Sequence, residues 1–445
     1  MSHYISNTEQ DRNAMLQAIG VADVAELFDV VPQDVRFPQV ELPQPLSEAE
    51  LLRELRRMSQ RNANAQTHTV FLGAGAYNHF VPSTVDALLR RAEYYTAYTP
   101  YQPELAQGTL QVIFEYQTLM CGLTGMDVAN ASHYDGATAM AEAAGMALNL
   151  TRNKRTILVA PTVHPQYRAV LRTYLQGLGV TIKGDADPAV SLDDVLAQID
   201  DATAAVIVQT PDFLGQLHDL KPIADKIHAV GGLLIATIDP IALGLFQTPG
   251  AAGADIVVGE GQSLGIPLSY GGPYLGIFAC KEQYVRRMPG RLAGATTDVD
   301  GQLGYVLTLQ TREQHIRREK ATSNICTNQG LMMLASTVYT CLMGKHGLRR
   351  VAELCYHRAH YAATEIGNIP GFELLTPAPF FKEFAVRTPK AVRELNQALA
   401  ERGIIGGYDL KRDYPHLGDA MLIAVTEMNS KADIDALVAV LKELA

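Results

Sequence analysis

The sequence predicts an α/β protein built around a large, mostly parallel sheet. Through the middle of the chain, short apolar runs alternate with helical patterns, and these runs are continuous rather than alternating in polarity. Strands of that kind are covered on both faces, as in parallel sheets with right-handed helical crossovers. The 445 residues are 47% hydrophobic and 19% charged, which allows two or three domains with a large buried core.

Residues 1–70 are expected to form an N-terminal helical arm. Ser47 and Glu50 have the spacing of a capping box, and apolar residues recur at helical intervals after them. The opposite face of this helix carries arginines, which suit either a solvated surface or packing on a partner chain. The proline-spaced residues 37–46 predict an extended strap.

Residues 71–330 are expected to form the large α/β domain. Six apolar runs predict its strands: 156–160, 180–183, 204–209, 233–238, 255–258 and 274–279. Helical patterns such as 167–178 and 220–230 separate most of them, whereas a glycine-rich loop joins the last two.

Residues 331–445 are expected to form a linking helix and a smaller C-terminal α+β domain. The linking helical stretch covers 331–341 and 348–366. The smaller domain follows with segments 381–387 and 391–402 and a closing helix at 432–444.

Composition and charge exclude several classes of protein. The 37 Lys and Arg residues against 47 Asp and Glu residues argue against nucleic-acid binding. No apolar run approaches the roughly 20 residues that cross a bilayer, and the first residues lack the order of a secretory signal. Five scattered cysteines without a C-x-x-C pair favour a reducing cytoplasm. No metal site is expected, because His357, His360 and Cys355 share one helix without converging ligands.

The nucleotide-like motif at residues 70–78 is weak. It has a G-x-G at Gly73 and Gly75, but Asn78 stands where a third glycine is needed for helix and strand to touch. The motif also precedes the α/β alternation instead of opening it. A dinucleotide oxidoreductase is therefore a minor alternative.

The turn at residues 134–136 leads into an alanine-rich helix that begins near Ala137. The free N–H groups of such a helix start can hold an anion such as a cofactor phosphate. Asp135 is also well placed to cap those N–H groups itself, three residues before Thr138. Structural capping is favoured, with phosphate binding and partner contact left open.

Asp239 ends the buried strand 233–238, at the edge where open α/β sheets bind ligands. An aspartate there can hold a pyridinium nitrogen protonated, as pyridoxal-phosphate enzymes require. Such enzymes also need a lysine for the Schiff base, expected about 20–30 residues downstream on the next strand end. Residues 257–267 contain no lysine, and Gln262 cannot form an imine. The sequence thus predicts the scaffold of such an enzyme without its nucleophile.

Residues 93–104 concentrate tyrosines in a proline-punctuated segment that is expected to be extended. Its members include Tyr95, Tyr98 and Tyr101, with Thr99 between them. Tyrosine combines an apolar ring with a hydroxyl donor. The segment therefore suits either ordinary interface packing or a polar pocket for a small zwitterion.

Several segments together resemble the alpha-subunit family of the glycine cleavage system P protein. They cover most of the chain up to about residue 330: GAGAYNHFVP (73–82), YTPYQPELAQG (98–108), FEYQTLMCGLTGM (114–126), SHYDGATAMAEA (132–143), DPIALGL (239–245) and GADIVVGEGQSLGIPLSYGGP (253–273).

The resemblance implies a pyridoxal-phosphate-dependent transferase-like protein of fold type I. It implies two alpha and two beta chains, with pyridoxal phosphate on the beta chain and none bound by this one. Gln262 then replaces the Schiff-base lysine, while Asp135, Thr138 and Asp239 are relics of cofactor contacts. The complex would decarboxylate glycine and pass the aminomethyl group to the lipoyl arm of the H protein. Tyr95, Tyr98, Thr99 and Tyr101 are the residues expected to complete the pocket of the partner.

Two other functions stay as alternatives. A self-sufficient pyridoxal-phosphate enzyme would use a lysine from a less usual place. A pseudoenzyme would only stabilise or regulate a catalytic partner.

Overall fold

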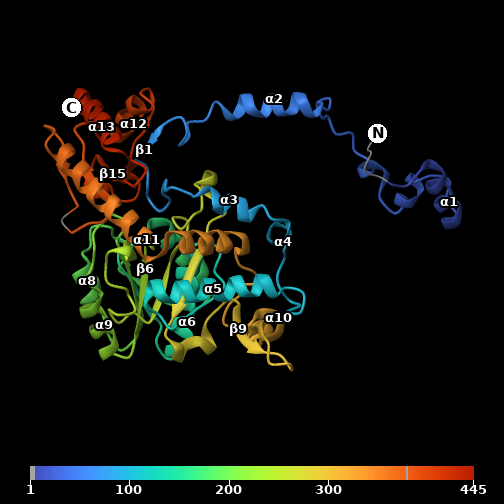
Figure 1. Ribbon diagram of the computed structural model, residues 1–445, viewed down its shortest axis with the longest axis horizontal. Helices are drawn as coiled ribbons and strands as arrows, with labels where there is room; N and C mark the ends of the chain where they lie inside the picture. The colour runs from blue at the N-terminus through green and yellow to red at the C-terminus, as the bar shows by residue number, and fades with distance from the viewer. Residues whose placement is uncertain (1–5, 377–378) are drawn as a thin grey trace. The chain divides into compact units, whose positions relative to one another are not determined.

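The computed structural model describes residues 6–376 and 379–445 (Figure 1). Packing of the backbone divides the chain into two compact units, Met1–Asn62 and Ala63–Ala445. Among the described residues, no helix combines the length and the apolar character needed to cross a bilayer.

The first unit contains two helices, α1 (Glu9–Ile19) and α2 (Glu48–Ser59), with short 3-10 turns at Ala25–Phe28 and Gln33–Val35 between them. The capping box predicted at Ser47 is confirmed, since its hydroxyl accepts from the Glu50 N–H and the Glu50 carboxylate accepts in return. None of the residues of α2 is buried. The apolar residues of α2 are each about half exposed: Leu51, Leu52, Leu55 and Met58.

The second unit is organised around a seven-stranded sheet in the order β2-β8-β7-β6-β5-β3-β4. All six predicted strands are present, and β2 adds an edge strand. Their bounds are β2 Val128–Ala129, β3 Thr156–Val159, β4 Thr181–Lys183, β5 Thr203–Thr210, β6 Leu233–Ile238, β7 Ile256–Glu260 and β8 Gly276–Cys280. Strands β4, β3, β5, β6 and β7 are parallel, and β8 runs antiparallel to β7 because a loop rather than a crossover helix joins them.

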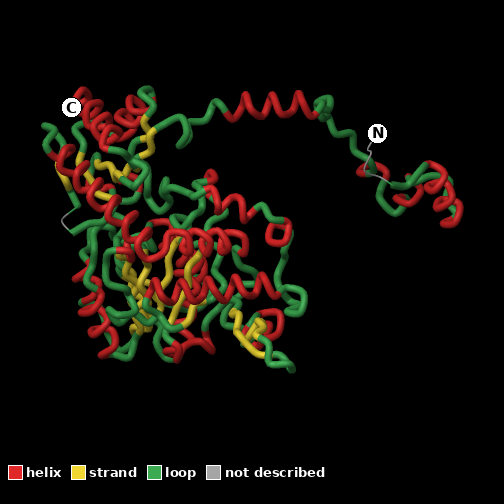
Figure 2. The backbone as a smooth tube through the Cα atoms, viewed as in Figure 1, coloured by secondary structure: helices red, strands yellow, loops and turns green. Residues whose placement is uncertain are grey.

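Helices cover both faces of this sheet, which explains its continuous apolar strands (Figure 2). In β5, Val206 and Val208 belong to one core, whereas Ala205 and Ile207 belong to the other. The first core also takes residues from α5 (Gln107–Thr124), α8 (Leu192–Leu196), α9 (Leu220–Ala229) and α11 (Gly330–Gly367). The second takes residues from α6 (Gly136–Thr151) and α7 (Pro165–Leu175). Shorter elements join these layers: α3 (Ser83–Leu89), α4 (Ala92–Tyr95), α10 (Gln314–Arg317) and the hairpin of β9 (Leu292–Thr297) and β10 (Leu303–Thr308).

Helix α11 (Gly330–Gly367) connects this sheet to a four-stranded antiparallel sheet near the C-terminus. Non-helical backbone at Gly344, with φ of 54°, interrupts α11 between the two predicted helical stretches. The second sheet has the order β11 (Glu373–Leu374), β12 (Glu383–Arg387), β15 (Ala420–Ala424) and β14 (Tyr408–Asp409), with α12 (Val392–Ala400) and α13 (Lys431–Leu444) beside it. Strand β1 (Thr69–Val70) pairs with β13 (Ile404–Ile405).

The predicted segment 381–387 is a strand only from Glu383 onward. Phe381 and Lys382 precede it and line a pocket at the edge of the large sheet. This displacement brings a lysine of the C-terminal part against the strand ends of the large sheet.

Candidate functional site

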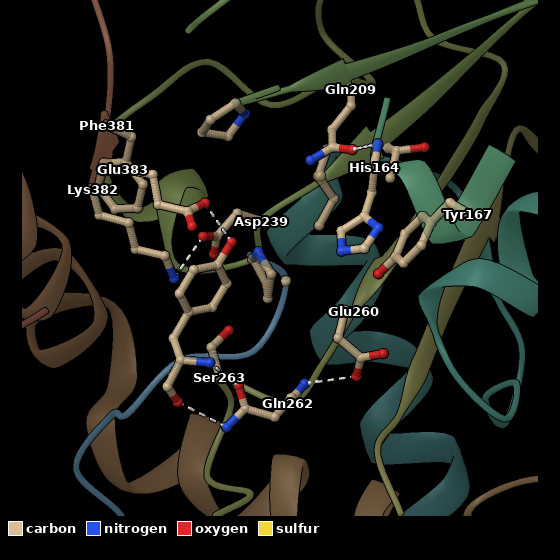
Figure 3. Close-up of a pocket in the computed structure, with 16 residues that line it drawn as sticks. His164, Tyr167, Gln209, Asp239, Glu260, Gln262, Ser263, Phe381, Lys382 and Glu383 are labelled. Carbon is tan, nitrogen blue, oxygen red and sulfur yellow. Dashed lines mark hydrogen bonds and ion pairs between the residues drawn. The ribbon is translucent and has the colours of Figure 1, made fainter. Parts of the chain in front are cut away.

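The pocket lies where the parallel strands β5, β6 and β7 end (Figure 3). Gln209 is near the end of β5, Asp239 directly follows β6, and Glu260 is the last residue of β7. Phe381, Lys382 and Glu383 close the pocket from the C-terminal part of the chain. Parallel strands bring their carboxyl ends to one edge, so residues far apart in sequence meet here.

Lys382 forms the central ion pair of the pocket. Its Nζ lies 2.7 Å from Oδ2 of Asp239, and its side chain is 2% exposed. The same nitrogen lies 3.0 Å from Nε2 of His79 and 3.5 Å from the centre of the Tyr77 ring. The carboxylate at the strand end is therefore already neutralised by a cation of this chain.

A second carboxylate lies behind His79. The His79 Nδ1 is 2.7 Å from Oε2 of Glu427, and the Cys355 thiol is 3.5 Å from the same oxygen. Burial would raise the pKa of Glu427, but the hydrogen bond and charge of His79 and backbone N–H groups lower it to about 2. Donor atoms of these three residues lie within 4.8 Å of one another, a spacing that a metal ion can use. The adjacent Lys382 ammonium disfavours a further cation, so hydrogen bonding explains the cluster.

His360 and Cys355, which lie on one helix, have different partners in the structure. The ring of His360 stacks on Phe380 at 3.9 Å, and its Nε2 lies 3.1 Å from the Phe380 carbonyl oxygen. Cys355 instead contacts Glu427. These two helix neighbours therefore do not converge on one point.

Gln262 is fully used in hydrogen bonds and only 1% exposed. Its Nε2 donates to the carbonyl oxygens of Tyr77 at 3.0 Å and Ile266 at 2.7 Å, and its Oε1 accepts from the Tyr77 N–H at 2.8 Å. The amide thus joins two loops that form the wall of the pocket. An amide provides no nucleophile at this position.

Glu260 accepts hydrogen bonds from three backbone N–H groups. Its Oε1 accepts from Gln262 and Leu275, and its Oε2 accepts from Gly136, the first residue of α6, each at 3.0 Å. Burial raises the pKa of Glu260 to about 8, although these hydrogen bonds oppose the shift. The carboxyl group therefore occupies a donor at the helix start, where an anion could otherwise bind.

Asp135 caps the same helix, as the favoured prediction has it. Its Oδ1 accepts from the Thr138 N–H at 2.7 Å, and the Thr138 hydroxyl accepts from the Asp135 N–H at 3.2 Å. This reciprocal pair is a complete capping box. Asp135 and Glu260 together use two N–H groups of the first turn of α6.

The interior of the pocket is filled by aromatic rings. The ring of Tyr167 stacks on His164 with centroids 4.7 Å apart, and its hydroxyl packs against Gly136. The remaining cavity volume is about 40 Å³. Small-molecule sites usually have roughly 300 Å³ or more, so this space suits water rather than a cofactor.

The G-x-G motif has a packing role here. A side chain on Gly73 would collide with Glu383 and Ala424, and one on Gly75, where φ is +104°, would collide with His164. Glu383 accepts from the Ala74 N–H and the Tyr77 hydroxyl, both at 2.7 Å. The glycines allow this loop to approach the pocket wall closely.

The tyrosine segment lies elsewhere and is not uniformly extended. Tyr95 is in the helical turn α4, because the backbone N–H of Tyr95 bonds to the Arg91 carbonyl, while Tyr98 and Thr99 follow in a loop. These three residues line a separate cavity of about 220 Å³ against α5 and the start of α11. Tyr95 is 67% exposed and Tyr98 81% exposed. The prediction that residues 93–104 form one extended segment is therefore wrong for its first residues, which belong to α4.

Tyr101 is separate from that cavity. Its hydroxyl accepts from the Arg291 guanidinium at 3.1 Å, and the Arg291 guanidinium carbon lies 5.3 Å from its ring centre. Glu313 is 3.7 Å from the same buried arginine. Three of the four predicted residues thus share a cavity, and the fourth holds a buried cation.

Comparison with known proteins identifies the family. The family model described as "Glycine cleavage system P-protein" matches residues 2–441. The chain belongs to the glycine cleavage system P-protein family. A relative from Thermomicrobium roseum, named a probable glycine dehydrogenase (decarboxylating) subunit 1, is 55% identical over 440 residues, which cover 98% of each chain.

Solved structures confirm the predicted fold class. A crystal structure of glycine decarboxylase (P-protein), in inhibitor-bound form, matches with a TM-score of 0.92 and 44% identity over 100% of both chains. A glutamate decarboxylase from Lactobacillus brevis matches with a TM-score of 0.68 over 94% of this chain and 96% of that one. At 13% identity the second match shows the fold alone. The P-protein chain described here has the fold of type I pyridoxal-phosphate enzymes.

The pocket of this P-protein chain does not fit the cofactor that its fold family implies. Asp239 is paired with Lys382, the Gln262 amide cannot form an imine, and Glu260 holds the Gly136 N–H. The cavity volume of about 40 Å³ leaves no room for a phosphorylated ring.

Sequence reasoning missed four of the residues that define this pocket: His164, Tyr167, Glu260 and Lys382. A charged residue at the end of the apolar run of β7 was a usable signal for Glu260. No local pattern marks Lys382, because lysine is normally exposed and its partner Asp239 lies far away in sequence.

Proposed function

We propose that this chain is the alpha subunit of a P protein that decarboxylates glycine together with a beta subunit. The supporting observation is the full-length similarity to relatives named glycine dehydrogenase (decarboxylating) subunit 1. A name that contains "subunit 1" implies a second subunit in those relatives. The function requires a partner that carries what this pocket lacks.

The beta subunit would carry the pyridoxal phosphate, and this chain would bind none. The lack of a lysine at Gln262 and the ion pair of Asp239 support that assignment. The cofactor would supply an electron sink for the loss of carbon dioxide from glycine. Two alpha and two beta chains would form the complex in the cytoplasm, and the lipoyl arm of the H protein would accept the aminomethyl group.

This chain would contribute residues to a site shared with the beta chain. Tyr95, Tyr98 and Thr99 border one cavity, and the rings of Tyr95 and Tyr98 are mostly exposed. Exposed tyrosines supply rigid rings and hydroxyl donors at low entropic cost when a partner covers them. Tyr101 would act differently, by holding Arg291 beside the segment.

Reconstitution tests this function. The purified chain, a beta chain and lipoylated H protein are mixed, and the release of labelled carbon dioxide from carboxyl-labelled glycine is measured. We expect release only when both chains are present. Equal release by the beta chain and H protein alone would favour the alternative, in which this chain is a regulatory pseudoenzyme.

The visible absorption spectrum tests the location of the cofactor. The chain alone is saturated with pyridoxal phosphate, freed of excess and treated with borohydride. We expect no stable visible band and no labelled peptide. A labelled lysine would contradict the assignment and favour a self-sufficient enzyme.

A further inference from the structure

Three side chains that line the pocket contact its polar walls. The ammonium of Lys382 lies at Asp239 (Figure 3). The carboxyl group of Glu260 and the hydroxyl of Tyr167 both lie at Gly136, the start of α6. Each comes from a different part of the chain: the segment before β12, the end of β7 and the first turn of α7. Their meeting in one pocket calls for an explanation beyond the loss of one lysine.

The contact that Lys382 makes with Asp239 is of the kind that the protonated nitrogen of a pyridinium ring would make. A carboxylate at this strand end can hold a protonated ring nitrogen. The Lys382 ammonium supplies one positive charge and an N–H donor at 2.7 Å from Oδ2. The side chain of Lys382 is 2% exposed and that of Asp239 is 12% exposed, so the pair is largely shielded from bulk water.

The contact that Glu260 makes at the start of α6 is of the kind that a bound phosphate would make. Oxygen atoms of a bound phosphate accept N–H groups at a helix start. Oε2 of Glu260 already accepts from the Gly136 N–H at 3.0 Å, and Oε1 accepts from two further backbone groups. Asp135 uses the Thr138 N–H. A phosphate would have to displace both carboxyl groups from these donors.

The hydroxyl of a stacked tyrosine lies at the same helix start as Glu260. Tyr167 stacks on His164 at 4.7 Å and an interplanar angle of 25°, and its hydroxyl touches Gly136. We propose that the pocket is a cofactor site closed from within, in which Lys382 takes the position of the ring nitrogen of pyridoxal phosphate, while Glu260 and the Tyr167 hydroxyl take that of its phosphate. This inference rests on the proposed function, in which the chain itself binds no cofactor.

The inference differs from the loss of the lysine alone in one testable respect. If Gln262 were the only obstacle, Gln262→Lys would restore cofactor binding. If the pocket is closed from within, the lysine at position 262 finds no space for the cofactor. A lysine there can still donate to the Tyr77 and Ile266 carbonyls that Gln262 now contacts, so the loops keep part of their hydrogen bonding.

The experiment compares four full-length proteins: the wild type, Gln262→Lys, an opened variant and a matched control. The opened variant combines Gln262→Lys with Lys382→Ala, Tyr167→Ala and Glu260→Ser. The control combines Gln262→Lys with Lys411→Ala, Tyr361→Ala and Glu373→Ser, which change residues with surface ion pairs or hydrogen bonds. Each protein is incubated with pyridoxal phosphate and borohydride, and the labelled peptide that contains position 262 is quantified.

We expect the opened variant to yield at least about tenfold more labelled peptide than Gln262→Lys or the control. Equal labelling of Gln262→Lys and the opened variant would overturn the inference. No gain in an opened variant that keeps a cooperative thermal transition would also overturn it. A stoichiometric label on any other lysine of the wild type, found by mapping all its peptides, would instead overturn the proposed function, so the two failures are distinguishable.

Smaller variants decide the question if the opened variant does not fold. Gln262→Lys is combined with Glu260→Ser alone or with Lys382→Ala alone. Each double variant is expected to be labelled more than Gln262→Lys. The absence of any gain in both would contradict the inference.

Discussion

The pocket at Asp239 and the segment around Tyr98 both concentrate polar side chains, but they use them in opposite ways. In the pocket, the polar groups of Lys382, Gln262 and Glu260 bond to other groups of this chain. In the segment, Tyr95 and Tyr98 turn 67% and 81% of their surface to solvent. The comparison teaches that the polar groups at the strand ends are bonded within this chain, whereas the two tyrosines keep surface that a partner can cover.

The largest expected effect concerns the buried ion pair of the pocket. Lys382→Met removes the cation that pairs with the Asp239 carboxylate. The Asp239 side chain is only 12% exposed. Breaking a buried pair in this way costs about 3–5 kcal/mol in the free energy of unfolding. Chemical denaturation measures the loss.

Lys411→Met is the matched control, since Lys411 pairs with Asp419 at the surface with 59% of its side chain exposed. Surface pairs contribute roughly 0–1 kcal/mol. If both variants lost the same free energy of unfolding, the ion pair in the pocket would contribute no more than the surface pair, which would contradict the prediction.

A smaller effect is expected from Glu260→Gln, as a change in the pH dependence of stability. Burial raises the pKa of Glu260 from 4.5 to about 8, so the folded chain holds this proton more tightly than the unfolded chain. Wild-type stability therefore falls as pH rises from about 5 to 8, by roughly 3 kcal/mol for this group. Glu383, whose pKa burial raises to about 7, acts in the same direction over a narrower window.

Thermal unfolding between pH 5 and 8 tests this slope. Glu260→Gln is expected to flatten it, and the exposed Glu373→Gln to leave it unchanged. A wild-type protein that gains stability over this range would show that the three N–H bonds hold Glu260 ionised.

The contrast with the tyrosine segment predicts an effect on activity rather than stability. Tyr98→Phe removes one hydroxyl from an 81% exposed side chain and is expected to leave the melting temperature unchanged. In the reconstituted complex, the loss of one hydrogen bond would lower glycine turnover about tenfold or less. Tyr361→Phe, which removes a hydroxyl bonded to Asp435, is the control. Unchanged glycine affinity and turnover would exclude Tyr98 from the shared site.

The strands of the large sheet were predictable because their burial on both faces leaves a continuous apolar run, as in β6. The role of Asp135 was predictable as well, because a capping box is a local pattern. Strand β15 was missed although its five residues are apolar and buried, since nothing local separates such a run from a buried helix segment.

The closure of the pocket depends on contacts that no local pattern records. Lys382 meets Asp239 only because the C-terminal part of the chain packs over the strand ends. A lysine at the start of an apolar segment is expected to be exposed, since buried lysines are rare. The absence of a lysine from residues 257–267 was visible in the sequence, but the pocket contacts of Lys382 and Glu260 were not.

The smallest expected effect tests the cap of α6, where the pocket meets the helix. Asp135→Ala removes the acceptor of the Thr138 N–H and is expected to cost about 1 kcal/mol in the free energy of unfolding. Ser47→Ala removes the same kind of cap from α2, none of whose residues is buried, and serves as the control for capping alone. If Asp135 is purely structural, the glycine turnover of each folded complex stays at the wild-type level while the melting temperature falls. A clear loss of turnover with unchanged melting temperature would instead mean that the start of α6 contacts a ligand or the partner chain.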